Sequence, residues 1–412
     1  MNPRSAADRR RVFRRLLLLS LLHFAAIAVM LLSARWIVDL GGNKSVLGWF
    51  SAAILPGIVT GAPLAGKWAG RIPERHLILV GIALSACSLF ALSHYTQISY
   101  SLLFWRFVQG FGHGMVFASI FGLAAHSIPE GKKSQGIGYI ALAIQLGNLV
   151  GVSLAEGLLL HSGYPDMYLG GVVLSGLAML CALGLPRRTS QQVGGASSPG
   201  TADGLIPQPA QVILAIAFFF VLGGSYGTVL QLIPLLVQEA GRSSGAPATA
   251  APVMATIFIT VAACRLLLAR LADGRHQRAV LIAFMLLLMG STLAWPFAAS
   301  ISQLTLTALF FALGYGLLFP GLNGLVISRV TPEWRSRASG WVVTAFDGGF
   351  FGMLLILGPV AEYFGYRTTF VLLAALQLLM GGVFLQMARR IRKKPVPSTP
   401  EQGDKARFCP RQ

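Results

Sequence analysis

The chain contains twelve long apolar runs that are separated by short polar segments. Each run has about 19 to 28 residues, and a helix that rises about 1.5 Å per residue needs roughly 20 residues to cross a bilayer. Lipid offers no hydrogen-bond partners to the backbone, so runs of this length should cross as helices. The pattern predicts an all-α integral membrane protein with twelve transmembrane helices. The predicted spans are residues 16–38, 47–69, 77–96, 101–125, 137–160, 168–186, 210–237, 250–269, 279–298, 303–328, 338–361 and 368–388.

The 33 Lys and Arg residues lie almost entirely on one side of these spans. When the loops are numbered alternately from the N-terminus, 28 of them share the side of the N-terminus. Three, Lys44, Arg242 and Arg367, fall on the other side, and two lie within spans. Because basic loops stay cytoplasmic, both termini are predicted to be cytoplasmic. The net charge of +19 is interpreted as a topology signal that faces anionic lipid, not as a nucleic-acid surface.

The predicted spans fall into two sets of six. A segment rich in Ser, Gly, Pro and Gln separates the sets and predicts a flexible cytoplasmic linker. Four short patterns recur 202 or 203 residues apart, among them Gly112-His113-Gly114 and Gly314-Tyr315-Gly316. Two pseudo-symmetric six-helix bundles are predicted, with a substrate site between them near the middle of the membrane. The predicted parts are a basic cytoplasmic N-tail 1–15, an N-terminal bundle 16–186, a linker 187–209, a C-terminal bundle 210–388 and a basic cytoplasmic C-tail 389–412.

Loop and span motifs resemble those of the major facilitator superfamily, over residues 16–388. The loop motif stands as GKWAGRIPER at 66–75, with Gly70 at the usual Asp, and as ARLADGR at 269–275, where the Asp is kept. The fourth span contains RFVQGFGHG at 106–114, like the family element R-x-x-Q-G-x-G-x-G. The resemblance implies alternating access by a working monomer, and it links Arg106 to proton coupling. It also implies a cytoplasmic gate that includes Gly66, Arg71, Arg265, Asp273 and Arg275.

The second half is similar to bacterial efflux permeases. The similarity rests on Phe346-Asp347-Gly348-Gly349 and Gly365-Tyr366-Arg367. It implies export across a bacterial plasma or inner membrane. The fifth span does not follow the drug-antiporter pattern G-P-x-x-G-G, because residues 151–156 read GVSLAE.

Two acidic residues, Glu156 and Asp347, lie well inside spans. A charge at a helix centre costs roughly 2.5–3.5 kcal/mol, so each needs a partner or a function. Asp347, near the midplane, is expected to exchange protons or contact substrate, with a structural hydrogen bond as the alternative. Glu156 is expected to pair with Arg106, either as a structural contact or as a gate. The proton-coupling candidates are Asp347, Arg106 and Glu156.

Other polar residues inside the spans are candidates for lining a cavity. Arg106, Gln109 and His113 share one face of the fourth predicted helix. Arg35 and Asp39 are four residues apart and should form an interfacial salt bridge, with substrate contact as the alternative. Glycines at 110, 112, 114, 147 and 151 are expected to be helix-packing seams. The substrate-cavity candidates are Gln109, His113, Gln145, Asn148, His23, Arg35, Tyr226, Gln231 and Asn323.

The sequence shows no nucleotide-binding P-loop and no nucleophile or metalloprotease motif. Its four cysteines have neither metal-ligand spacing nor a disulfide pattern. The prediction is a non-enzymatic, proton-coupled exporter of a small organic molecule, with no cofactor, no metal site and no nucleic-acid partner. Its expected partners are the substrate, protons and the bilayer. An importer or uniporter, a lipid flippase and a non-transporting sensor on the same scaffold remain the alternatives.

Overall fold

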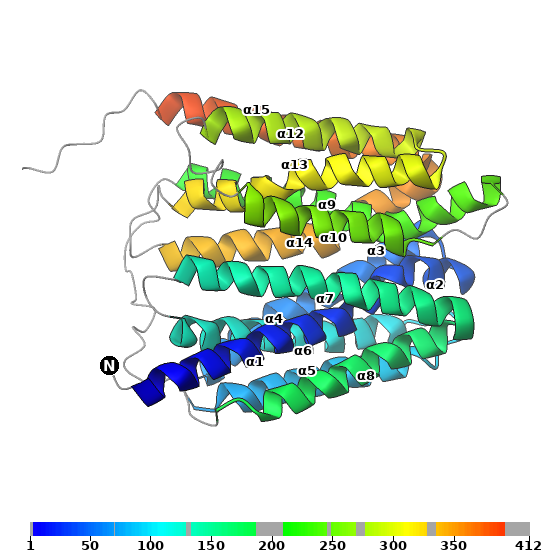
Figure 1. Cartoon of the computed structure of the whole chain (residues 1–412). Helices are drawn as coiled ribbons and strands as arrows, with labels where there is room; N and C mark the ends of the chain where they lie inside the picture. The colour runs from blue at the N-terminus through cyan, green and yellow to red at the C-terminus, as the bar shows by residue number, and fades with distance from the viewer. Residues whose placement is uncertain are drawn as a thin grey trace, which may run out of the picture.

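The computed structural model describes residues 3–69, 71–128, 133–186, 209–244, 249–268, 277–327 and 335–391. Its regular structure within these ranges is helical (Figure 1), which confirms the all-α prediction. Ten helical spans of the described chain are long and apolar enough to cross a membrane. The eighth predicted span corresponds to a shorter apolar helix, Ala251–Leu267, and the twelfth to the helix Gly365–Ile391.

The first two predicted spans are each broken in the structure. The first consists of α1 (Pro3–Ala28) and α2 (Ser33–Asp39), joined by a 3-10 turn at Val29–Leu32. α1 therefore continues through most of the predicted N-tail. The second consists of α3 (Lys44–Ala52) and α4 (Ile54–Trp68). The other helices of the first half are α5 (Glu74–Leu92), α6 (Ser101–Ser127), α7 (Lys133–Ser162) and α8 (Tyr164–Leu183).

The second half contains six long helices in the described ranges. They are α9 (Pro209–Ser244), α10 (Ala251–Leu267), α12 (Gln277–Ala294), α13 (Ile301–Ile327), α14 (Arg335–Tyr363) and α15 (Gly365–Ile391). Gly163 before α8 and Gly365 at the start of α15 have φ values of 92° and 77°. Glycine adopts such values without steric cost, so the two halves make equivalent tight turns. The predicted linker and C-tail lie almost entirely outside the described residues.

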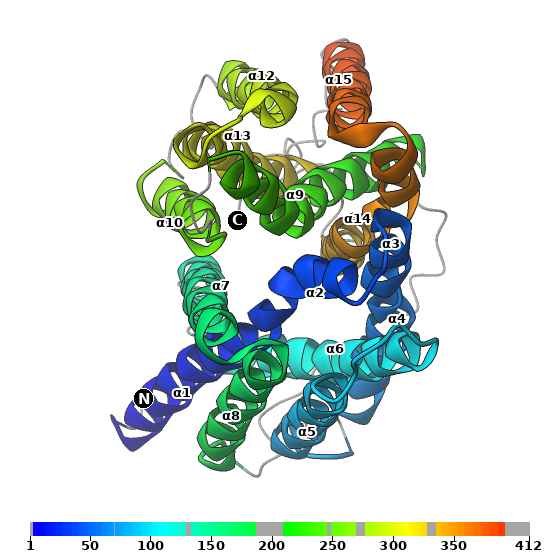
Figure 2. The same ribbon diagram turned by 90° about the vertical axis from the view of Figure 1, so that its right-hand side faces the viewer.

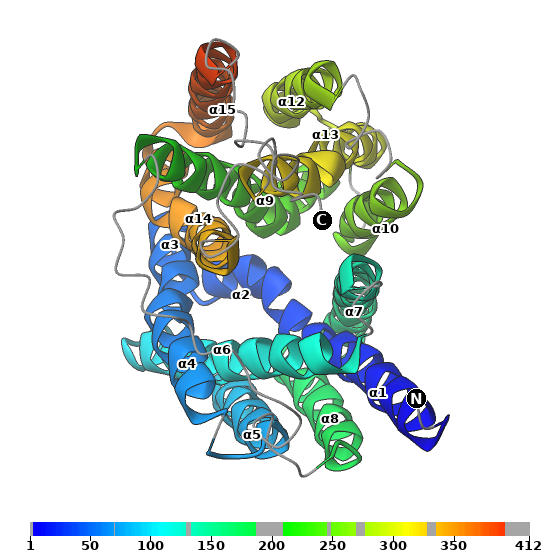
Figure 3. The same cartoon turned by 90° about the vertical axis from the view of Figure 1, so that its left-hand side faces the viewer.

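The two sets of helices lie side by side (Figure 1). We call the end at which α1 begins the inner end, and the opposite end, which carries α2 and α3, the outer end. Figures 2 and 3 show the outer and the inner end, respectively. The halves meet along two pairs of helices, because α7 packs on α10 and α3 packs on α14 (Figure 2). The charge distribution predicts that the inner end is cytoplasmic.

Glycines allow the helices within each half to approach closely. A Cβ atom on Gly151 of α7 would lie 2.1 Å from the carbonyl oxygen of Ala25 in α1. In the second half, a Cβ on Gly227 of α9 would lie 2.0 Å from the carbonyl oxygen of Phe350 in α14. No real Cβ fits at these distances, so glycine is required there. The glycines at 110, 112, 114, 147 and 151 all meet the backbone of a neighbouring helix, as predicted.

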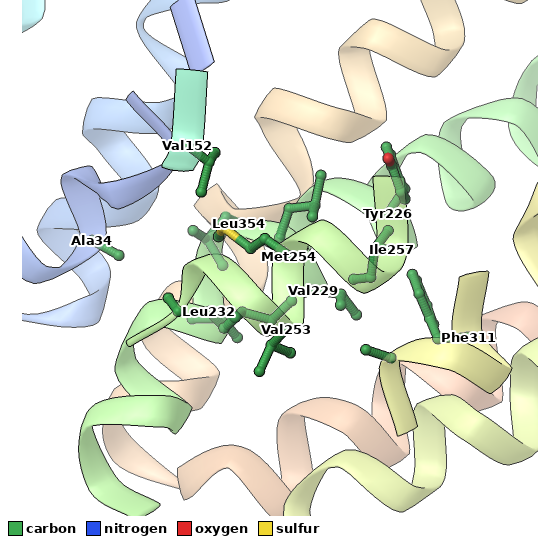
Figure 4. Packing of buried hydrophobic residues seen from close by; sticks show 14 of the residues in the cluster. Ala34, Val152, Tyr226, Val229, Leu232, Val253, Met254, Ile257, Phe311 and Leu354 are labelled. Carbon is green, nitrogen blue, oxygen red and sulfur yellow. The ribbon is translucent and has the colours of Figure 1, made fainter. Parts of the chain in front are cut away.

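The apolar core joins the halves at the outer end only, within the part of the chain that is described. One large cluster of buried residues contains members of both halves. Figure 4 shows part of it, with Ala34 and Val152 of the first half and Met254 and Leu354 of the second. A separate cluster belongs to the first half alone, and it includes Leu16 near the inner end of α1. This division places the tightest packing between halves at the outer end.

Candidate functional site

A buried ion pair lies at the outer end of the interface between the halves. Arg35 of α2 donates from Nη1 to Oε1 of Glu156 in α7, at 2.8 Å, and the two side chains are 8% and 3% exposed. Arg35 Nε also donates to the carbonyl oxygen of Pro234 in α9, at 3.0 Å. Glu156 Oε2 accepts the backbone N–H of Ala251 at the start of α10, at 2.7 Å. The Arg35 side chain is thus bonded to α9, and the Glu156 side chain to α10.

Two predicted ion pairs are wrong. Arg35 does not pair with Asp39, which accepts a hydrogen bond from the Tyr164 hydroxyl. Asp39 is exposed, and an ion pair in water gains little, whereas the carboxylate of Glu156 is buried beside Arg35. Glu156 consequently does not pair with Arg106. The helical spacing of Arg35 and Asp39 permitted their pairing, but burial determined the partner.

Arg106 of α6 lies in the core of the first half and is 4% exposed. Its Nε donates to the carbonyl oxygen of Phe50 at 3.3 Å, and its Nη1 donates to Oε1 of Gln109. The guanidinium also lies 4.8 Å from the centroid of the Phe50 ring. Among the residues that the structure describes, no carboxylate pairs with Arg106. The predicted proton-coupling arginine is therefore a buried cation held by neutral groups.

Two stacked ring pairs occupy corresponding places in the halves. In the first half, His23 Nε2 lies 3.1 Å from His113 Nδ1, and the rings stack with centroids 5.3 Å apart. In the second half, Tyr226 stacks on Tyr315 with centroids 4.1 Å apart. Gln145 of α7 donates from Nε2 to the Tyr226 hydroxyl at 3.4 Å, which connects the halves. The structure thus pairs the predicted residues His23 and His113 within the first half, and it pairs Gln145 with Tyr226 across the interface.

Asp347 of α14 is partly exposed and makes no hydrogen bond or ion pair with any residue in the described ranges. It lies within electrostatic range of Tyr315, as does Arg265. The resemblance implies that Arg265 belongs to a loop of the cytoplasmic gate, but the structure places it in the last turn of α10. Its long side chain reaches Tyr315 from there. Asp347 and Arg265 are therefore both near the tyrosine pair.

Gln231 of α9 connects the halves on the other side of the interface. Its Oε1 accepts a hydrogen bond from the Ser51 hydroxyl in α3, and its Nε2 donates to the carbonyl oxygen of Phe350 in α14 at 3.0 Å. A second amide, Asn323, has a buried Oδ1 without a hydrogen-bond partner in the described chain. Asn148 is partly buried. Gln231 is thus a contact between the halves, in addition to being a cavity candidate.

The predicted gate residues are only partly described. Gly66 lies in α4, and no atom would meet a Cβ placed on it within 4 Å. Arg71 is exposed just after α4. Asp273 and Arg275 lie outside the described residues, so the predicted gate of the second half stays a prediction.

Sequence reasoning missed the aromatic residues that lie near Arg106. Trp36 packs with its ring centroid 5.9 Å from Phe50 and 5.0 Å from Tyr168. These residues look like ordinary apolar positions in the sequence, and no signal distinguishes them. Tyr315 could have been found from the sequence, because it occupies the position in the second repeat that His113 occupies in the first.

Comparison with known proteins gives a consistent result for the fold. The family described as Major Facilitator Superfamily matches residues 16–353. The 3-(3-hydroxy-phenyl)propionate transporter of Escherichia coli strain K12 is 27% identical and aligns with 86% of this chain and 87% of its own length. The Staphylopine export protein of Staphylococcus aureus is 20% identical, over 93% of this chain and 96% of its own. A crystal structure of the nucleoside transporter NupG superposes with a TM-score of 0.75 at 15% identity, over 92% and 99% of the two chains.

Proposed function

This chain belongs to the Major Facilitator Superfamily, and from that premise we propose that it exports a small organic molecule in exchange for protons by alternating access. A protein of this family is a secondary transporter, so solute gradients and not nucleotide hydrolysis drive it. The relative that is an export protein covers nearly the whole chain and supports the outward direction. The bilayer in which it works is proposed to be a bacterial plasma or inner membrane.

The observation that carries the proposal is the difference between the two ends of the interface. At the outer end, the Arg35–Glu156 pair holds α9 and α10. A second contact closes the same outer end, where α3 meets α14 and α15. There the backbone N–H of Lys44 donates to Glu362 Oε2 at 3.0 Å, and Lys44 Nζ lies 4.3 Å from the centroid of the Tyr366 ring. The described inner end has no shared apolar core. A site that is closed outside and less joined inside can accept a molecule from the cytoplasm.

Asp347 is proposed to carry the transported proton. A carboxylate inside a membrane span is costly without a partner, and Asp347 has neither an ion pair nor a hydrogen bond within the described chain. A proton removes this cost, because the neutral acid is much easier to desolvate. The side chain is also partly exposed, so a proton can reach it. Asp347 would take up its proton from outside and release it inside.

Glu156 is proposed to be the latch that responds to an external proton. A protonated Glu156 loses its charge attraction to Arg35 and becomes a weaker acceptor for the Ala251 N–H. The bond of Glu156 to Arg35 within the first half and its bond to Ala251 of the second half would weaken together, and the outer end would open. Loss of the proton would restore the pair and close it again. In this cycle protons move inward and substrate moves outward.

The test compares the small molecules that cells release when they contain wild type, Asp347→Asn or no transporter. Asp166→Asn is the matched control, because it makes the same change at an exposed position in the first turn of α8. Membrane levels are matched, and each culture is measured with and without a protonophore. We expect a compound that wild type and Asp166→Asn release and that Asp347→Asn and protonophore-treated cells do not. Equal release by wild type and Asp347→Asn would remove Asp347 from the mechanism, and equal release by all cultures would contradict export.

A further inference from the structure

The core of the first half holds a positive charge for which the described chain supplies no negative partner. Arg106 is 4% exposed, yet its hydrogen bonds go to a carbonyl and an amide. The two intramembrane acids do not neutralise it, because Glu156 binds Arg35 and Asp347 has no ion pair. Desolvating an unpaired guanidinium costs several kcal/mol. A ligand that supplies the missing negative charge would offset this cost.

The groups around Arg106 are arranged as donors. An arginine side chain can only donate, so the Gln109 atom that faces it must be the amide oxygen. This orientation directs Nε2 of Gln109 away, and Nε2 is buried without a hydrogen-bond partner in the described chain. The hydroxyl of Tyr168, within electrostatic range of Arg106, is also buried without a partner. A positive charge beside unsatisfied donors fits a carboxylate, which accepts several hydrogen bonds.

Partly buried aromatic rings lie around His113, which is within electrostatic range of Arg106. His113, one helical turn from Gln109, contacts Phe24 of α1 with ring centroids 5.4 Å apart and Phe117 of α6 at 6.0 Å. The second half presents Phe350, which lies 5.9 Å from Tyr226. These three phenylalanines are only partly buried. Aromatic faces and edges favour a flat, apolar ring.

We propose that Arg106 and the Nε2 of Gln109 bind the carboxylate of the transported molecule, and that this molecule is an aromatic carboxylic acid in its anionic form. The inference rests on the transport function proposed above and names its substrate class. Arg106 is then a substrate-binding residue and not part of the proton path. Outward movement of an anion together with inward movement of a proton transfers positive charge inward. A membrane potential that is negative inside therefore assists both.

The test measures binding to the purified full-length protein in detergent by isothermal titration calorimetry at neutral pH. The probes are benzoate, 3-phenylpropanoate and indole-3-acetate, and each is paired with its neutral primary amide. The amide has nearly the same shape, so the difference reports the charge. We expect at least one acid to bind wild type about tenfold or more tightly than its amide, since hydrogen bonds between charged partners are the stronger ones. This comparison needs no variant and does not depend on refolding.

Variants then assign the preference to the proposed residues. Arg106→Gln should remove the preference for the acid and leave amide binding within about twofold, and Gln109→Leu should weaken acid binding by several fold. Arg367→Gln is the control, because it removes the same charge from an exposed position. The removal of a buried, unpaired charge should leave the protein folded, and a symmetric size-exclusion peak checks this.

Each outcome bears on one proposal. If no acid binds wild type more tightly than its amide, or if Arg106→Gln keeps the full preference, the anion site is overturned. If the preference depends on Arg106 but export does not depend on a proton gradient, the anion site stands and the proposed coupling is wrong.

Discussion

The two halves of this transporter use the same positions for different chemistry. At the offset of 202 residues that relates Gly163 to Gly365, His113 corresponds to Tyr315 and Gln145 to Asp347. Each half stacks two rings there, histidines in the first half and tyrosines in the second. The comparison teaches that ring packing persists where the ionisable groups change. Asp347, the acid proposed to carry the proton, is in one half, and Arg106, which pairs with no acid in the described chain, is in the other.

The halves also close the outer end by different means. Glu156 corresponds at the same offset to Gly358. The carboxylate of Glu156 holds α10 by accepting one hydrogen bond from the Ala251 N–H. Gly358 instead lets α14 lie so close to α3 that a Cβ would be 2.5 Å from the carbonyl oxygen of Lys44. A charged contact can be broken by one proton, but a packed contact cannot. The α3–α14 side also contains the bond between the Lys44 N–H and Glu362, but Glu362 is exposed, whereas Glu156 is buried. The α7–α10 side is therefore the one expected to respond more strongly to pH.

Loss of one member of the ion pair should have the largest effect. Arg35→Gln leaves Glu156 as a buried, unpaired charge, at a cost of about 3–5 kcal/mol to the outer-closed state. We expect the outer end to open, with a longer distance between spin labels at His161 and Thr368, exposed positions in opposite halves. Pulsed electron paramagnetic resonance measures this distance on a variant from which the native cysteines have been removed.

The double variant Arg35→Met with Glu156→Leu is the control for the ion pair. Similar apolar volume can replace a buried pair with little loss of stability. The double variant should stay closed at the outer end while failing to transport. Opening as large as in Arg35→Gln would show that the unpaired charge of Glu156 is not what opens the outer end in that variant.

Crowding of the packed side should have a smaller effect. A Cβ on Gly48 would lie 2.4 Å from the carbonyl oxygen of Leu354, so Gly48→Ala must push α3 from α14. Overpacking costs about 1–3 kcal/mol, and the same spin labels should show partial opening. Gly176→Ala in α8 is the control, because no atom would meet its Cβ within 4 Å. Equal distances in both variants would contradict the packed contact.

Changes to the ring pairs should have the smallest effect and should differ between halves. His23→Phe keeps an aromatic ring but leaves His113 Nδ1 without its partner, which costs about 1–3 kcal/mol of unfolding free energy. Tyr226→Phe keeps the stack and loses one long hydrogen bond from Gln145, worth about 0.5–1.5 kcal/mol. Thermal unfolding of the two purified variants compares them directly. A larger loss for Tyr226→Phe would reverse this ranking of the halves.

Much of the fold could be predicted because span length is a local property of the sequence. Every predicted span corresponds to a helix, and the glycine seams lie where their spacing indicated. The break at Val29–Leu32 was missed, since the residues there are as apolar as their neighbours. The sequence predicted which residues belong to the site, but it did not predict which of them contact one another. His23 and His113 are 90 positions apart, and no periodicity relates them.

The sequence by itself determined the membrane class, the helix positions and the faces that carry polar groups. Hydrophobic length and helical spacing act within one segment, so they can be read without knowledge of the neighbours. The tertiary structure alone decided that Arg35 pairs with Glu156 and that Arg106 pairs with no acid among the described residues. The energy of a charge in lipid depends on which groups meet it after the helices pack, and those groups come from distant parts of the chain.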